Sequence, residues 1–285
     1  MLDRLGNARG LPARIGAYKV IELLGLPPLG ALYKASDTAS GNSVVIKLMT
    51  GLRGADRATL ERFHSQAALE AGLQHPNSLA VCDVGLVDGS PYLVMEYVEG
   101  ESLANIMESG RLIPISDKIG YIIEVCRALS YVHSKRIVHR NIKSAKVMIL
   151  KGGGVKICDF GMAYIEDEQA RVPTPVGQIV GAPTHMSPEQ IKGEVVDARS
   201  DIFSTGVVLH ELLTGSLPFQ GLSVADTLER ILHDPPRPFT DSLGSYTARL
   251  QEITFRTLAK DRGLRYQTSV DLAFDLGEVR ERIAA

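Results

Sequence analysis

The stretch that decides the fold reads His139-Arg140-Asn141-Ile142-Lys143, with Asp159-Phe160-Gly161 following thirteen residues after Lys146. Up to about residue 95 the chain has mostly the pattern of strands, and from about residue 101 apolar residues recur at helical spacing. We therefore expect a small sheet-rich part followed by a larger helical part, which contains both motifs.

Five upstream segments are short, rich in β-formers and separated by turn residues, which predicts strands. They are 18–24, 31–35, 43–49, 79–86 and 91–97. Asp88-Gly89, between the last two, is a strong hairpin signal. One helix, 58–73, is expected to interrupt the strands. In the later part Ser116 is expected to cap a helix, and another helix is expected over 200–213, closed by Gly215.

The composition is that of an ordinary soluble globular protein of 285 residues, of which 45% are hydrophobic and 22% charged. A formal net charge of −2 gives no electrostatic case for binding nucleic acid or an anionic membrane. Cys82, Cys126 and Cys158 lie far apart without metal-ligand spacing, which favours a reducing compartment over a disulfide framework. No signal peptide and no apolar run of about 18 residues is present, so the sequence predicts a cytoplasmic chain without a membrane segment.

Several motifs follow one another in the order and at the spacings of protein kinases. Beside the two quoted above, they are Gly25-Leu26-Pro27-Pro28-Leu29-Gly30, Val44-Val45-Ile46-Lys47, Ser187-Pro188-Glu189 and 201–206. Each one alone is weak evidence, but all of them in order is strong evidence. On these motifs the chain resembles the bacterial, eukaryotic-like serine/threonine protein kinases over nearly its whole length.

The resemblance implies an α+β, bilobal protein-kinase-like fold. A small antiparallel β-sheet N-lobe with one main helix would span 17–95, after a flexible lead-in at 1–16. A hinge would span 96–100, and a larger, mostly helical C-lobe would span 101–285.

Two departures from the family pattern fall at the catalytic loop. Asn141 stands where the family has the catalytic aspartate, and an amide is not a base near neutral pH. Lys146 stands where the family has an asparagine that binds the second Mg²⁺. A lysine has donors but no acceptor, so it would repel a cation rather than bind one.

Two more departures lie upstream. Gln66 replaces the glutamate that would pair with Lys47, and Glu70, one helical turn later, is the alternative partner. Pro27 replaces the middle glycine of the glycine loop and Pro28 follows it, which removes two backbone donors from a phosphate-binding loop. A rigid hairpin tip without a ligand is an equally good interpretation. Relative to the family, the changes at 66, 141 and 146 each add one positive charge, +3 in total.

The resemblance also assigns roles to residues that are retained. Lys47 and Lys143 would face phosphates, and Asp159 would be the one remaining metal ligand. Val45, at a position where an alanine commonly lines the adenine site, would narrow the pocket, and Met95 would lie behind the hinge. The expected nucleotide-binding residues are Gly25, Gly30, Leu32, Val45, Lys47, Glu96, Val98, Met148 and Asp159.

Other retained residues are expected to be structural. His139 and Phe160 would join the apolar stack that links the lobes, Asp201 would brace the catalytic loop, and Glu189 would pair with Arg265. Thr174 is a candidate phosphosite facing Arg140, with an unmodified loop threonine as the alternative. Ala182 replaces a threonine that normally contacts the catalytic loop.

These observations favour a catalytically deficient pseudokinase that acts as a scaffold, an allosteric partner or a nucleotide-binding switch. The alternative is a weakly active ATP-dependent serine/threonine protein kinase. ATP is a candidate ligand, while Mg²⁺ is expected to bind weakly, as one ion at most, or not at all. Protein partners are expected and nucleic acid is not.

Overall fold

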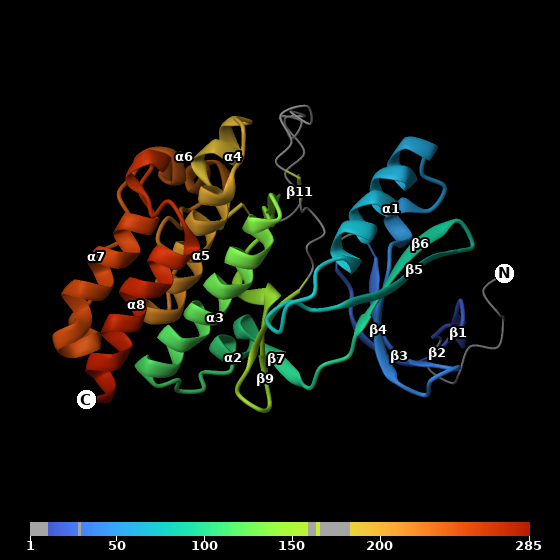
Figure 1. The fold of residues 1–285 in the computed structure, drawn as a ribbon. Helices are drawn as coiled ribbons and strands as arrows, with labels where there is room; N and C mark the ends of the chain where they lie inside the picture. Colours follow the sequence, from blue (N-terminus) through green and yellow to red (C-terminus); the bar gives the residue numbers. More distant parts are fainter. Residues whose placement is uncertain (1–10, 28–29, 159–163, 166–182) are drawn as a thin grey trace. The chain divides into compact units, whose positions relative to one another are not determined.

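A computed structural model describes residues 11–27, 30–158, 164–165 and 183–285, and these form two compact units (Figure 1). One, called here the sheet unit, comprises Met1–Gln74 and Leu79–Glu99. The other, the helical unit, comprises His75–Ser78 and Gly100–Ala285. Each unit has its own hydrophobic core and is described separately below.

The sheet unit is built on six antiparallel strands in the order β1-β2-β3-β4-β6-β5. Its elements are β1 (Arg14–Ile15), β2 (Tyr18–Gly25), β3 (Ala31–Asp37), β4 (Ser43–Leu48), the 3-10 helix η1 (Thr50–Leu52), α1 (Arg57–Ala71), β5 (Val81–Val87) and β6 (Ser90–Glu96). The five predicted strands and the predicted helix are confirmed, with bounds that shift by one or two residues. Residues 1–16 were expected to be a flexible lead-in, but Arg14 and Ile15 within this range form β1 and pair with β2.

Strand β4 shows how the sheet is buried on both faces. Val44, Ile46 and Leu48 point to one face and belong to a core cluster with residues of β1, β2, β3 and β6. Val45 points to the opposite face, into a second cluster that contains Ala67 of α1. Because side chains alternate along a strand, Lys47 lies on the same face as Val45.

The predicted hairpin at Asp88-Gly89 joins β5 to β6. Both residues have positive φ, 48° for Asp88 and 76° for Gly89, which is the backbone of a type I′ turn. This turn matches the right-handed twist of the flanking strands and therefore sets the register of β5 against β6, which pairs Val87 with Ser90.

The helical unit contains most of the helices and three short strand pairs. Its strands are β7 (Gly100–Ser102), β8 (Ile137–Val138), β9 (Val147–Leu150), β10 (Val155–Ile157) and β11 (Tyr164–Ile165). Its α-helices are α2 (Leu103–Glu108), α3 (Ile115–Ser134), α4 (Pro188–Lys192), α5 (Ala198–Thr214), α6 (Val224–His233), α7 (Thr247–Thr257) and α8 (Ser269–Ala284). The 3-10 helices are η2 (Ser144–Lys146), η3 (Asp241–Tyr246) and η4 (Arg262–Leu264).

Helix α5 is the centre of this unit. All of its residues from Ser200 to Leu213 are buried except Glu211, as expected for a helix that is covered on every side. The Asp197 side chain caps its N-terminus by accepting from the Arg199 amide, and Gly215 ends it with φ of 73°. The predicted helix and its closing glycine are therefore confirmed.

The start of α3 differs from the prediction. The helix begins at Ile115 with Pro114 as its N-cap, and no side chain caps it. Ser116 lies inside the first turn, where its hydroxyl contacts Asp117 Oδ1 at 3.4 Å. The expected Ser116 cap is wrong because the fixed φ of Pro114 already starts the helix two residues earlier.

Candidate functional site

The predicted catalytic loop, His139 to Lys143, follows β8 and is held by one buried carboxylate. Asp201, at the start of α5, is fully buried and accepts from the backbone amides of His139 (2.8 Å) and Arg140 (2.7 Å). His133 Nε2 of α3 lies 2.8 Å from the same carboxylate. Hydrogen bonds to an ionised acceptor are about twice as strong as neutral ones, so Asp201 fixes this backbone firmly.

The loop needs this support because its backbone is strained. Arg140 has φ of 63°, in the left-handed region that residues with a side chain rarely adopt, at a cost of about 1–3 kcal/mol. Its carbonyl accepts from Gln190 Nε2 at 2.8 Å, so the residue is fixed on both sides of its Cα atom. The position of residue 141 is thus set by contacts that do not involve its own side chain.

Asn141 occupies that position and is half-buried. Its backbone amide donates to His139 Nδ1 at 3.3 Å. His139 itself is fully buried. The geometry therefore presents residue 141 from a rigid turn, but the group presented is a neutral amide with no basic carboxylate.

Lys143 and Lys146 lie at the two ends of the next turn. The Lys146 amide donates to the Lys143 carbonyl at 2.8 Å, and the Lys146 carbonyl accepts from Cys158 N at 2.9 Å. The Lys146 residue is only 6% exposed, whereas Lys143 is half-buried. An ammonium group is therefore enclosed at the position where the family pattern has a metal-binding amide oxygen.

A buried ion pair between Glu189 and Arg265 joins α4 to the segment after η4. Arg265 donates Nη1 to Glu189 Oε1 (2.7 Å) and Nη2 to Glu189 Oε2 (2.8 Å), and the Ser200 hydroxyl donates to the same carboxylate. Arg265 also donates to the carbonyls of Ala259 (2.8 Å) and Arg199 (2.9 Å). Burial alone would raise the pKa of the Glu189 carboxyl, but Arg265 and Ser200 more than offset it and the pKa lies below its usual value.

In the sheet unit the expected nucleotide-facing residues lie on adjacent strands. Leu32 of β3 pairs directly with Lys47 of β4, and Val45 pairs with Met95 of β6. Leu32 and Val45 are partly buried in the same apolar cluster, on the face of the sheet that α1 covers. The register thus places Leu32, Val45 and Lys47 on the same face of the sheet.

The glycine loop has a specific reason to keep one of its two glycines. A Cβ added to Gly30 would lie 1.9 Å from the Leu48 carbonyl oxygen, whereas one added to Gly25 meets nothing within 4 Å. The Gly30 amide donates to the Pro27 carbonyl at 3.0 Å. Gly30 therefore allows the close approach to Leu48, and its amide is already hydrogen-bonded.

The remaining expected contacts divide between the units. Glu96 and Val98 belong to the sheet unit, where Glu96 Oε1 accepts from the Ala80 amide at 2.8 Å. Met148 belongs to the helical unit, where it pairs with Lys156 in β10 and Ser102 in β7.

Comparison with known proteins gives the same assignment as the motifs. Residues 18–269 match the sequence profile described as the protein kinase domain. The chain belongs to the protein kinase domain family.

Curated relatives and a solved structure agree with this family. The kinase domain is 36% identical over 271 residues to a probable serine/threonine-protein kinase of Streptomyces coelicolor, covering 93% of this chain and 40% of the relative. It is 34% identical over 268 residues to the serine/threonine-protein kinase PknB of Mycolicibacterium smegmatis, covering 93% of this chain and 43% of that protein. The chain thus spans about two-fifths of the length of the curated relatives that it matches.

The fold has a close counterpart among solved structures. The crystal structure of the Mycobacterium tuberculosis PknI kinase domain superposes with a TM-score of 0.74 at 24% identity, covering 96% of this chain and 99% of that one. The expected α+β protein kinase fold, with an antiparallel sheet lobe and a larger helical lobe, is confirmed.

Several predicted site residues lie outside what the structure describes. Asp159, Phe160, Thr174, Ala182 and Pro28 are not among the described residues. Gln66 lies on α1, but its side chain is not described. Glu70, one turn later on the same helix, is 4% exposed.

The family generally uses ATP and Mg²⁺. A site for Mg²⁺ needs side chains with oxygen ligands. Among the described residues no cluster of three or more His, Cys, Asp or Glu side chains forms a metal site. Lys146 supplies no lone pair to a metal.

Three contacts were not predicted from the sequence: His133 with Asp201, Gln190 with the Arg140 carbonyl, and Ser200 with Glu189. Only Gln190 had a readable signal, because Ser187 and Gln190 have the spacing of a capping box and form one at the start of α4. Within the described part of the kinase domain, no helix is long and apolar enough to cross a membrane.

Proposed function

We propose that this chain is a catalytically deficient protein kinase domain that acts as a scaffold or allosteric partner, or as a nucleotide-binding switch. The observation that carries the proposal is Asn141, a neutral amide on a loop that Asp201 holds in place through His139 and Arg140. The frame of the catalytic loop is retained while its base is replaced.

The chemical consequence follows from the role of that position in the family. The catalytic aspartate orients the substrate hydroxyl and accepts its proton. Asn141 retains hydrogen-bonding capacity but does not accept a proton at neutral pH. Losing general-base assistance lowers a rate on the order of 10²–10⁴-fold.

Lys146 strengthens the same interpretation. Lys146 is buried where the family has a metal ligand, and a protonated lysine has no lone pair to offer to Mg²⁺. Pro27 and Pro28 supply no amide hydrogen, and the Gly30 amide bonds to Pro27, so the loop has fewer donors for phosphate. Lys143, on the loop that Asp201 supports, is a cation that suits a nucleotide phosphate without metal, which supports the switch.

A weakly active ATP-dependent serine/threonine kinase is the second candidate. It is supported by the named activity of the relatives and by the pairing of Leu32, Val45 and Lys47 on adjacent strands. Phosphoryl transfer depends heavily on positioning, so a retained Lys47 and Asp159 would leave a slow reaction.

Calorimetric titration with ATP separates these functions, performed once in excess Mg²⁺ and once in a chelator. We expect binding that survives the chelator and that weakens in the Lys146→Asn variant. Binding that requires Mg²⁺, together with phosphorylation of a protein substrate abolished by Asp159→Ala, would instead establish the weak kinase. No binding in either buffer would leave the scaffold alone.

We infer a cytoplasmic setting and protein partners for this domain. Cys82, Cys126 and Cys158 are free thiols, which suits a reducing compartment. A formal net charge of −2 supports no nucleic-acid partner.

A further inference from the structure

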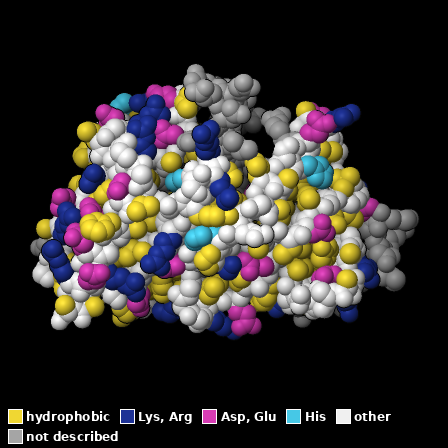
Figure 2. Space-filling view, viewed as in Figure 1, with side chains coloured by type: hydrophobic (Ala, Val, Ile, Leu, Met, Phe, Trp, Pro, Cys, Tyr) yellow, Lys and Arg dark blue, Asp and Glu magenta, His cyan; other side chains and the backbone are white. Residues whose placement is uncertain are grey.

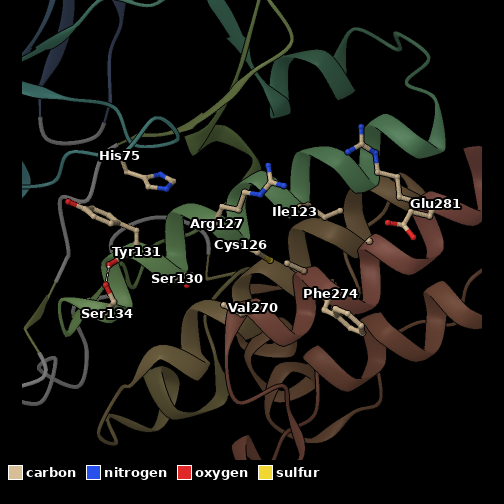
Figure 3. A pocket seen from close by; sticks show the side chains of 13 residues that line it. His75, Ile123, Cys126, Arg127, Ser130, Tyr131, Ser134, Val270, Phe274 and Glu281 are labelled. Carbon is tan, nitrogen blue, oxygen red and sulfur yellow. Dashed lines mark hydrogen bonds between the residues drawn. The ribbon is translucent and has the colours of Figure 1, made fainter.

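An open groove lies on the helical unit between α3 and α8 (Figure 3). None of the predicted nucleotide-binding residues lines it. Its volume is about 740 Å³, within the range of ~300–1,000 Å³ that is usual for ligand sites. Ile123 and Cys126 of α3 line one side, and Val270, Ala273 and Phe274 of α8 line the other. His75 and Tyr131 stack at one end, with ring centroids 5.0 Å apart.

The side chains of α8 that line the groove are not part of the core. Leu272, Leu276 and Val279 face inward and are buried. Val270 and Phe274 face outward and are 57% and 67% exposed. Figure 2 shows hydrophobic side chains interspersed with Lys and Arg side chains over the helical unit. An exposed phenylalanine beside a hollow is a feature of binding surfaces.

Gly277 makes the hollow. It lies in the interior of α8, where a glycine costs about 1 kcal/mol relative to alanine. A Cβ added there would meet nothing within 4 Å, so packing within this chain does not require a glycine. Ala273 lies one helical turn before it on the same side. Small residues at this spacing allow the backbone of another helix to approach closely.

The groove also has a charge preference. Arg127 and Arg280 line it, with Glu281 as the single acidic lining residue. Arg127 pairs with Glu124, but among the described residues no ion pair with Arg280 is present. The Arg280 guanidinium lies over Gly120 of α3, where an added Cβ would be 3.1 Å from its central carbon. Burial lowers the pKa of His75 and raises that of Cys126 to about 12, so neither of these two groups favours a charged form at neutral pH.

We propose that this groove docks an amphipathic helix of a partner protein, with apolar residues against Ala273, Phe274 and Gly277 and acidic residues toward Arg280. Helix-in-groove recognition uses apolar anchors at positions i, i+3 or i+4, and i+7. The open apolar hollow takes the anchors, the missing side chain at Gly277 admits the helix backbone, and Arg280 selects the acidic flank. The docking does not depend on whether the nucleotide site is active.

The test uses a fluorescein-labelled synthetic helix of about 15 residues with leucines at those positions, glutamates along one flank and alanines elsewhere. Fluorescence anisotropy measures its binding to the whole chain and to two matched variants. Gly277→Ala raises helix propensity but leaves the hollow open, and we expect affinity within about twofold of the parent. Gly277→Leu fills the hollow, and we expect affinity at least ~10-fold weaker, with an unchanged or higher Tm.

A second pair of measurements tests the charge preference. A peptide with lysines in place of the glutamates should bind the parent chain more weakly, and Arg280→Glu should reverse the order of the two peptides. The proposal is wrong if the acidic peptide does not bind or if Gly277→Leu binds it as tightly as Gly277→Ala does. It is also wrong if Gly277→Leu abolishes self-association seen by light scattering, or if lauric acid, but not the peptide, occupies the groove.

Discussion

The catalytic loop and the residues that hold it have diverged from the family pattern to different extents. Asp201 and the Glu189–Arg265 pair retain the family residues and form every contact expected of them. Asn141 and Lys146 differ from the aspartate and the asparagine that the family pattern has at these positions. The difference lies between residues that support the loop and residues that would act from it.

The physical costs of changing the two groups differ. Removing one partner of a buried ion pair leaves an uncompensated charge and destabilises the fold by about 3–5 kcal/mol. Replacing the side chain of Asn141 removes none of the described hydrogen bonds that hold the loop, because its amide bond to His139 comes from the backbone. The supporting residues therefore bear on the stability of the domain, whereas positions 141 and 146 bear on the chemistry of its loop.

The largest expected effect is on the supporting residues. Arg265→Ala leaves Glu189 charged and buried, so we expect a loss of about 3–5 kcal/mol in the free energy of unfolding measured with urea. Arg57→Ala is the matched control, since Arg57 pairs with Glu61 on the surface. That variant should lose less than about 1 kcal/mol. Equal losses in the two variants would show that the buried ion pair stabilises the domain no more than a surface ion pair does.

The second prediction concerns the replaced residues. Asn141→Asp combined with Lys146→Asn restores a base and a metal ligand, and we expect autophosphorylation with Mg²⁺ and ATP to rise by about 10²-fold or more. Asn141→Asp alone should gain much less, because Lys146 still repels the metal. The unfolding free energy of the Asn141→Asp variant should change little, because the described contacts of Asn141 are made by its backbone. An unchanged rate in the double variant would locate the deficiency elsewhere, for example at Gln66.

A third comparison separates the two glycines of the glycine loop. Gly30→Ala forces a Cβ against the Leu48 carbonyl oxygen, and overpacking of this kind costs about 1–3 kcal/mol. Gly25→Ala meets open space and should be neutral within about 0.5 kcal/mol. Thermal unfolding of both variants checks this. If Gly30→Ala were as stable as the parent, the glycine would have to be retained for a ligand rather than for packing.

The smallest expected effect is a pH dependence from Glu189. Its pKa in the folded chain lies below its ordinary value of 4.5, so its contribution to stability is present above pH 4.5 and is lost as the pH falls through the folded pKa. Urea midpoints measured between pH 6 and pH 3 should therefore fall. Glu189→Gln should lower the whole curve and flatten it below pH 4.5. If the urea midpoint of the Glu189→Gln variant fell with pH in parallel with that of the parent chain, other carboxyl groups would account for the loss of stability in acid.

Much of the architecture could be predicted from the sequence because local signals agreed with the fold. The strands followed β-forming segments, Asp88-Gly89 supplied a turn that needs positive φ, and Gly215 ended α5. The Ser116 cap was wrong because two N-terminal signals lay two residues apart and Pro114 took precedence.

The supports of the site were harder to predict because they depend on tertiary contacts. His133 and Asp201 lie 68 positions apart, and no spacing rule connects them. The groove has the same character, since it arises where Val270 and Phe274 of α8 come beside Ile123 and Cys126 of α3. In the sequence these residues read only as further apolar positions of two helices.

The hydrogen bonds that Asp201 accepts have a consequence for exchange with solvent. The amide protons of His139 and Arg140 point at a carboxylate that is fully buried at the start of α5, so water reaches them only when α5 separates from the loop. Their hydrogen–deuterium exchange should be as slow as that of the innermost residues of α5. The exchange rate of these two amides would then report how often the helical unit opens, measured at the loop itself.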